Sequence, residues 1–162
     1  MAAGLAWALV TTGFAVQAQD KERTRLTLQV QASMGVNPDA SGKAYPIKVR
    51  VYELKDAQVF QEAEYFTLDE KDKTALGGDL LARDEFILRP GESRKIERKS
   101  QAATQFIGVL AGYRDLAQST WRAVYRLPEA PEAAWFRAVI PSNKSDISIE
   151  LQAQGIVLSV AP

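Results

Sequence analysis

Two charged clusters contain the residue types from which a ligand site could be built. In the first, lysines are interleaved with the carboxylates of Asp69, Glu70 and Asp72. Such carboxylates bind calcium, but the six-oxygen spacing of a calcium-binding loop is absent. The second is the basic segment 93–99, which could bind an anion, although Glu97 interrupts it. We therefore expect the first cluster to be a solvent-exposed helix face, and the second to be an edge strand that discourages pairing with other chains.

The composition removes most catalytic chemistry. The 162 residues include no cysteine and no histidine, so thiol nucleophiles, imidazole bases, disulfides and the common zinc, copper and haem ligands are absent. Gly-rich phosphate loops, nucleophile elbows and zincin helices are also absent. No carboxylate lies in an apolar stretch that would make it a general acid. We expect no catalytic residues, no cofactor and no metal site; the nearest enzymatic alternative, a sandwich hydrolase, would need a pocket with perturbed carboxylates.

The overall charge is balanced. Twenty basic and twenty acidic residues are interspersed along the chain. This pattern predicts neither a nucleic-acid-binding surface nor one for an anionic membrane.

The N-terminal segment differs from the rest of the chain. Residues 1–18 carry no charge and form an apolar run that is too short for a comfortable membrane span. Ala15 and Ala18 place small residues where a signal peptidase reads them. We predict a signal peptide over residues 1–18 and a mature domain over residues 19–162, with a buried N-terminal helix as the alternative. No Lys or Arg precedes Leu5, which leaves the true start of the signal open.

Several segments along the chain predict strands, most clearly where apolar and polar residues alternate, as in residues 25–32 and 146–152. They cover residues 25–32, 47–54, 80–89, 93–99, 120–127, 135–140, 146–152 and 155–160. The second of these segments is expected to return beside the first.

Residues 106–113 form an uncharged segment that predicts a central strand, with a buried helix as the alternative. One face of this strand carries Gly108 and Gly112, and the other carries larger residues such as Ile107 and Val109. Glycine weakens a strand, so it indicates that another part of the molecule packs closely against that face.

Two short helices are predicted over residues 56–77. Asp56 can cap the first, which should end near Glu64. The capping-box pattern of residues 67–70 should begin the second at Leu68, and the glycine pair 77–78 should end it. Because the helices do not alternate with the strands, we expect antiparallel sheets. The predicted fold is an all-β, two-sheet sandwich of about eight strands with a helical insertion after the second strand.

Residues 33–44 form a long loop that is rich in Gly, Pro, Asn, Asp and Ser. Loops of about a dozen residues on a rigid scaffold are often functional. Met34 and Val36 either form an exposed apolar binding surface or fold back onto the core. The candidate partner-binding residues are Met34, Gly35, Val36, Asn37, Pro38, Asp39, Ala40, Ser41, Gly42 and Lys43.

Several segments, taken in order, resemble the TssJ (VasD-like) outer-membrane lipoproteins of the bacterial type VI secretion system. The resemblance covers residues 24–160 and rests on residues 49–54, Phe60, Phe66, residues 76–80, Pro90, Gly91, residues 106–116 and Trp121. It implies a transthyretin-like sandwich in the periplasm, at the inner face of the outer membrane. It also implies that the loop between the first two strands, here residues 33–44, binds the periplasmic C-terminal region of TssM.

This resemblance implies recruitment into a membrane complex without chemical turnover. The family's lipidated cysteine has no counterpart here, so we expect outer-membrane attachment only if the protein is lipidated. Neither nucleic acid nor a small-molecule substrate is an expected partner. The alternative function is a periplasmic carrier or chaperone that binds a small ligand or an extended peptide along a sheet edge.

Overall fold

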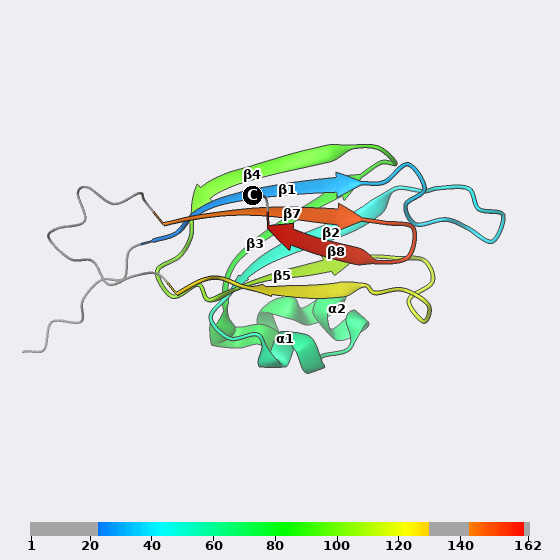
Figure 1. The fold of residues 1–162 in the computed structure, drawn as a ribbon. Helices are drawn as coiled ribbons and strands as arrows, with labels where there is room; N and C mark the ends of the chain where they lie inside the picture. The colour runs from blue at the N-terminus through cyan, green and yellow to red at the C-terminus, as the bar shows by residue number, and fades with distance from the viewer. Residues whose placement is uncertain (1–22, 130–142, 161–162) are drawn as a thin grey trace, which may run out of the picture.

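Two four-stranded sheets pack face to face in the computed structural model, which describes residues 23–129 and 143–160 (Figure 1). The first sheet has the order β4-β1-β7-β8, with β1 (Arg25–Ala32), β4 (Ser93–Lys99), β7 (Lys144–Leu151) and β8 (Ile156–Val160). The second has the order β3-β2-β5-β6, with β2 (Ile47–Leu54), β3 (Leu80–Leu88), β5 (Phe106–Ala111) and β6 (Arg122–Arg126). The predicted all-β sandwich is confirmed.

Two predictions about strand pairing are wrong. β2 does not return beside β1, because residues 33–46 carry the chain across to the opposite sheet. The sheets are not wholly antiparallel either, since β1 pairs in parallel with β7, from Arg25 opposite Lys144 to Ala32 opposite Leu151. β7 comes after β6, the last strand of the second sheet, but it lies in the first sheet, between β1 and β8. Alternation along one segment does not reveal such a distant neighbour.

The main core lies between the sheets. The side chains that alternate inward from β1, β2, β5 and β7 form it, and each is almost wholly buried: Leu26, Leu28, Val30, Val49, Val51, Ile107, Val109, Ile147 and Ile149. Burial of each such side chain contributes about 1.5–3 kcal/mol to folding. β4 lies at the edge of the first sheet, as its charged sequence predicts.

The helical insertion covers the outer face of the second sheet (Figure 1). It consists of α1 (Gln58–Glu62), α2 (Tyr65–Leu76) and the 3-10 turn η1 (Gly77–Asp79). A second buried cluster forms beneath it, with Tyr52, Leu54, Phe60, Leu68, Leu76 and Leu110. β2 and β5 are therefore buried on both faces, which explains why residues 106–113 are apolar on both sides.

The two glycines of the central segment allow the helices to approach the sheet. A Cβ atom on Gly108 would lie 3.0 Å from Cε1 of Phe60. A Cβ atom on Gly112 would lie 2.9 Å from the hydroxyl oxygen of Tyr65. Phe60 belongs to α1 and Tyr65 begins α2, so the predicted close packing against the glycine face is confirmed.

The helix boundaries follow the prediction only in part. The N-cap residue of α1 is Ala57 and not Asp56, although the side chain of Asp56 accepts a hydrogen bond from the amide of Gln58 at 2.7 Å. α2 begins at Tyr65, so the capping-box pattern 67–70 lies inside the helix and does not start it. Tyr65 packs edge-on against Trp121, with ring centroids 5.4 Å apart, and this tertiary contact holds the extra turn. Gly77, with φ of 51°, ends the helix as predicted.

Several predictions lie outside the described residues. These are the signal peptide over residues 1–18 and the strand over residues 135–140. Within the described parts of the chain, no helix has the length and apolar character needed to cross a membrane.

Candidate partner-binding surface

The loop between β1 and β2 lies at one end of the sandwich, together with three other turns (Figure 1). It contacts the β3–β4 turn, where the amide of Gly91 donates to the carbonyl of Ala32 at 3.1 Å. It contacts the β7–β8 turn, where the amide of Asn37 donates to the carbonyl of Ala153 at 3.2 Å. It also contacts the β5–β6 turn through Asn37 and Arg114. The four turns therefore form one continuous end surface.

Asn37 fixes the course of the loop from inside. Its side chain donates to the carbonyl of Pro46 at 2.9 Å and accepts from the amide of Arg114 at 2.7 Å. Its φ of 51° lies in the left-handed region, which Asn adopts more readily than most residues. Asn37 is only 4% exposed, so its side chain cannot contact a partner in this conformation. Asn37 therefore contributes to the shape of the loop.

The tip of the loop is preformed around Asp39. One carboxylate oxygen accepts hydrogen bonds from the amide of Ser41 at 2.8 Å, its hydroxyl at 2.6 Å and the amide of Lys43 at 3.0 Å. The amide of Asp39 also donates to the carbonyl of Lys43 at 2.9 Å. The Ser41 hydroxyl is the main cause of a lowered pKa at Asp39, and the backbone amides lower this pKa further. The ionised carboxylate thus holds the tip in one shape.

The structure separates the two apolar residues of the loop. Val36 is fully buried and joins the main core, whereas Met34 is 77% exposed. Met34 lies over the β3–β4 turn, since a Cβ atom on Gly91 would be 2.7 Å from its sulfur. Of the ten candidate residues, the exposed ones are Met34, Gly35, Ala40, Ser41, Gly42 and Lys43, while Pro38 and Asp39 are half-buried and Val36 and Asn37 are buried.

Tyr45 and Arg114 also belong to this surface, although the sequence did not predict them as part of it. The guanidinium of Arg114 lies 4.7 Å from the centre of the Tyr45 ring, and the ammonium of Lys43 lies 5.5 Å from it. These cation–π contacts brace the base of the loop. Tyr45 directly follows the predicted loop, and an aromatic residue at that position could have indicated that it belongs to the surface. Arg114 could not have been identified from the sequence, because it is far from the loop in the chain.

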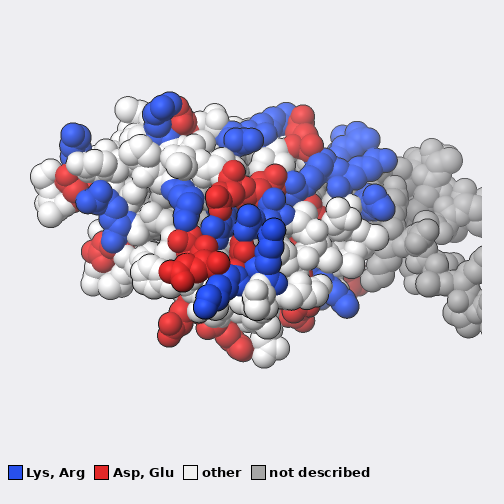
Figure 2. All heavy atoms as spheres, turned by 180° about the vertical axis from the view of Figure 1, so that it is seen from behind, with Lys and Arg blue, Asp and Glu red and all other residues white. Residues whose placement is uncertain are grey.

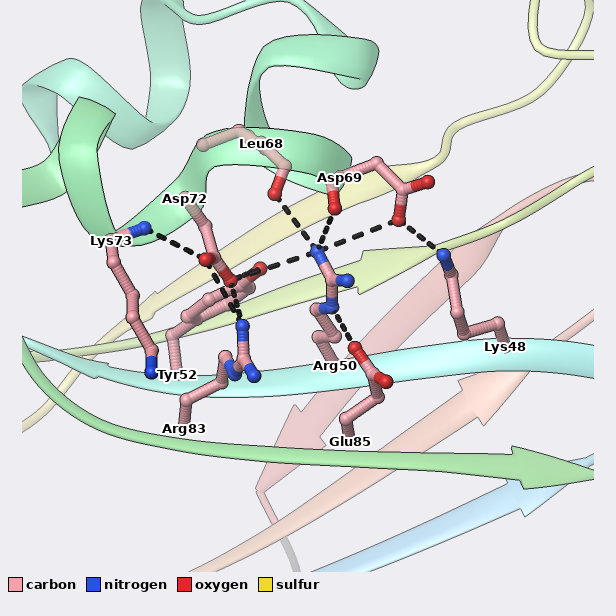
Figure 3. A network of polar contacts seen from close by, with 9 residues as sticks. All are labelled: Lys48, Arg50, Tyr52, Leu68, Asp69, Asp72, Lys73, Arg83 and Glu85. Atoms are coloured by element: carbon pink, nitrogen blue, oxygen red, sulfur yellow. Dashed lines mark hydrogen bonds and ion pairs between the residues drawn. The ribbon is translucent and has the colours of Figure 1, made fainter.

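A second polar cluster lies between α2 and the sheet (Figure 3). The predicted solvent-exposed helix face is wrong here, because Asp72 is only 4% exposed. α2 is kinked at Lys71, with φ of −136° and ψ of 30°. Just before the kink, Arg50 of β2 donates to two backbone carbonyls of the helix, at 2.9 Å for Leu68 and 2.8 Å for Asp69.

Ion pairs complete this cluster. Asp72 accepts from Arg83 at 2.8 Å and from the hydroxyl of Tyr52 at 3.1 Å. Arg50 pairs with Glu85, and Lys48 pairs with the side chain of Asp69. Burial tends to raise the pKa of Asp72, but the hydrogen bonds from Arg83, the amide of Lys73 and Tyr52 together lower it. These contacts clamp α2 onto the sheet.

A third polar cluster joins the two sheets. Glu53 of β2 is 1% exposed and accepts from Arg98 of β4 at 2.6 Å. Arg98 also donates to Asp84 at 2.6 Å. The other oxygen of Glu53 accepts from the amide of Gln101 at 2.8 Å and the hydroxyl of Thr104 at 2.7 Å. Two carboxylates, Glu53 and Asp72, are therefore buried, and both are paired with arginines.

The two clusters of buried carboxylates and arginines stabilise the fold. Across residues 23–129 and 143–160, no group of three or more acidic side chains is arranged to hold a metal ion. The arginines neutralise the buried carboxylates and tie together the helix, the sheets and the β4–β5 loop. The exposed loop tip is thus the strongest candidate for recognition of a partner.

Comparisons with known proteins agree with this architecture. The model of the type VI secretion lipoprotein family (VasD, EvfM, TssJ) matches residues 24–154. The T6SS lipoprotein TssJ1 from Pseudomonas aeruginosa is 39% identical, with a TM-score of 0.76; the alignment covers 86% of this chain and 98% of that chain. Lip from Serratia marcescens, a membrane bound component of the type VI secretion system, is 31% identical, with a TM-score of 0.75 and coverages of 84% and 97%.

A third solved structure, of the T6SS protein TssM C-terminal domain from EAEC, contains a chain that is 27% identical to this one, with a TM-score of 0.59. The alignment covers 85% of this chain and 98% of that chain. A search among curated proteins found no match. The family match spans the sandwich from the start of β1 to the β7–β8 turn, and this chain belongs to the TssJ family of type VI secretion lipoproteins.

Proposed function

We propose that this chain is a scaffold component of the type VI secretion membrane complex that binds the periplasmic C-terminal region of TssM. It would act in the periplasm at the inner face of the outer membrane, without chemical turnover. The observation that carries the proposal is the preformed, exposed tip of the β1–β2 loop within a chain of the TssJ family. The match to a chain in the EAEC structure of the TssM C-terminal domain supports the choice of partner.

The geometry of the loop suits protein recognition. A loop that is already ordered loses little conformational entropy when it binds, so more of the contact energy appears as affinity. Met34 supplies an exposed, adaptable apolar side chain beside the polar tip. The sandwich beneath holds the loop through Asn37 and the neighbouring turns.

The experiment compares the affinity of three proteins for a TssM periplasmic fragment by isothermal titration calorimetry. These are residues 19–162, the Met34→Asp variant and a matched control, Val160→Asp, which also alters an exposed apolar side chain but lies on β8. We expect Met34→Asp to weaken binding at least tenfold, since buried anchor residues dominate interface energetics. Val160→Asp should bind within twofold of wild type.

Circular dichroism melts would establish that the variants are folded. Equal affinity of wild type and the Met34→Asp variant would refute the assignment of the loop. If residues 19–162 do not bind the TssM fragment at all, the proposed partner is wrong.

A further inference from the structure

Three cations lie side by side at the end of the sandwich opposite the loop. Arg25 begins β1, and the strand register places Lys99 of β4 directly opposite it on one side and Lys144 of β7 on the other. Residues directly opposite in neighbouring strands point to the same face, with Cβ atoms about 5 Å apart. All three side chains are exposed. We call Arg25, Lys99 and Lys144 the basic row.

The basic row is not neutralised by ion pairing within the described parts of the chain. None of its members has a carboxylate oxygen within 4.0 Å there, whereas Lys48, Arg50, Arg83 and Arg98 all do. The nearest acidic register positions are Glu97 and Asp146, one row further along the sheet, and Glu97 already pairs with Lys95 at 2.6 Å. Like charges directly opposite one another are destabilising. An external anion would relieve this repulsion.

Further basic residues lie at the same end. Lys55 and Arg126 line a cleft of about 300 Å³ there, together with Thr24, which adjoins Arg25. Arg126 is only loosely paired with Glu129, at 3.9 Å. Seen from behind, Lys and Arg side chains gather toward this end, whereas basic and acidic side chains are mixed in the middle of the molecule (Figure 2).

We propose that this end of the sandwich binds the anionic headgroup surface of a lipid bilayer. Basic clusters bind such surfaces because each Lys or Arg gains attraction from the negative surface potential. The sequence alone does not predict this membrane-binding charge, because the three cations are far apart in the chain and are brought together only by strand pairing.

The proposal rests on the proposed function and adds an orientation to it. β1 runs from the basic row at Arg25 to the partner-binding loop that follows Ala32. Its eight residues span about 26 Å at the usual rise of a strand. A sandwich that is attached to a membrane at this end therefore has the loop at its other end, where a partner that extends from the opposite side can reach it.

The test is co-sedimentation of residues 19–162 with vesicles of phosphatidylethanolamine and phosphatidylglycerol at a 3:1 ratio, in low salt. We expect binding that is lost with phosphatidylcholine vesicles and in about 0.5 M salt, where screening is strong. The variant Arg25→Glu, Lys99→Glu, Lys144→Glu should bind at least tenfold more weakly, since each charge is worth about fivefold. A control with the same change in net charge, Arg89→Glu, Arg94→Glu, Lys95→Glu, should stay within twofold of wild type.

Three results would overturn the proposal: no binding of wild type to the anionic vesicles, equal binding of the basic-row variant, or displacement of the vesicles by short duplex DNA at equal phosphate concentration. If the glutamate variant does not fold, the glutamine variants of the same residues should still weaken binding several-fold. Affinity for the TssM fragment, measured without lipid, should be unchanged in the basic-row variant. Failure of membrane binding is thereby distinguished from failure of partner binding.

Discussion

The ring of Phe60 occupies the space that a Cβ atom on Gly108 would need, with Cε1 only 3.0 Å from the ideal Cβ position. Phe60 is fully buried and stacks at a tilt on Tyr52, with ring centroids 5.3 Å apart. The missing side chain on β5 therefore allows α1 to rest directly on the sheet. The central strand supports the helical insertion, while the loop proposed to bind the partner, residues 33–44, lies on a different part of the scaffold.

Replacement of Gly108 by alanine should destabilise the fold by about 1–2 kcal/mol, because the buried Phe60 and Leu54 side chains must shift to accept the new methyl group. Urea denaturation would measure this change in unfolding free energy. Gly78→Ala is the matched control: it has no atom within 4 Å of the added Cβ and no positive φ, and should change stability by less than about 0.5 kcal/mol. Equal stability of the two variants would contradict the packing described.

Asp72→Asn should destabilise the protein by about 2 kcal/mol, since the buried side chain loses the charge that pairs with the buried Arg50 at 3.6 Å and with the partly exposed Arg83 at 2.8 Å. Glu70→Gln on the exposed part of the same helix should have almost no effect. Urea denaturation at neutral pH compares the two variants. A small loss for Asp72→Asn, similar to that of Glu70→Gln, would show that the network does not hold α2 on the sheet.

The contribution of Asp72 should also depend on pH. Its pKa in the folded protein lies below the ordinary value of 3.8, because the hydrogen bonds it accepts outweigh the effect of burial. A carboxyl group whose pKa is lowered on folding stabilises the protein above its unfolded-state pKa and loses this contribution as the pH falls through the folded-state value. The difference in unfolding free energy between wild type and Asp72→Asn should therefore be constant from about pH 6 to 8 and shrink below about pH 4.

The sequence predicted the strands well wherever one face is buried and the other meets water. Arg25–Ala32 alternates cleanly and forms β1 over those residues. Pairing was harder to predict, because the parallel neighbour of β1 lies more than a hundred residues away. The acidic residues of α2 were misjudged for a similar reason: Asp72 is buried only because Arg50 and Arg83 approach it from two strands of the sheet.

Asn37 should stabilise the loop through both its side chain and its backbone conformation. Asn37→Gly removes the hydrogen bonds to Pro46 and Arg114 and should destabilise the protein by about 1–2 kcal/mol. Asn37→Ala should destabilise it by about 1 kcal/mol more, because a residue with a Cβ atom is strained at φ of 51°. Thermal and urea denaturation would measure both variants, and equal effects would indicate that the positive φ is not a constraint.

Asp39 should matter for binding more than for folding. Asp39→Ala removes the acceptor that orders the tip, so affinity for the TssM fragment should fall about threefold to tenfold. The melting temperature should remain within about 2 °C of wild type, because the tip is exposed. Asp39→Asn keeps an oxygen acceptor and should retain most of the affinity. If Asp39→Ala binds as tightly as wild type, the ordered conformation of the loop tip does not contribute to binding.

The candidate site was predictable in position but not in detail. Turn-forming residues identified the loop, but they did not show that Met34 is exposed while Val36 is buried in the core. Val36 is buried because Asn37, just after it, is anchored to the β5–β6 and β7–β8 turns. The basic row likewise exists only through the pairing of three strands. The pattern of apolar and polar residues predicts each strand by itself, whereas the loop and the basic row depend on which strands and turns lie next to one another.

Hydrogen–deuterium exchange of residues 19–162, with and without the TssM periplasmic fragment, shows directly whether the β1–β2 loop is the binding site. We predict slower exchange on binding within residues 34–43, most clearly at Gly35 and Ala40, for whose amides no backbone hydrogen bond is found among the described residues. β8, on the far edge of the first sheet, should be unaffected over its length. Protection confined to β8 or to the helical insertion, with unchanged exchange across residues 34–43, would show that the loop is not the binding site.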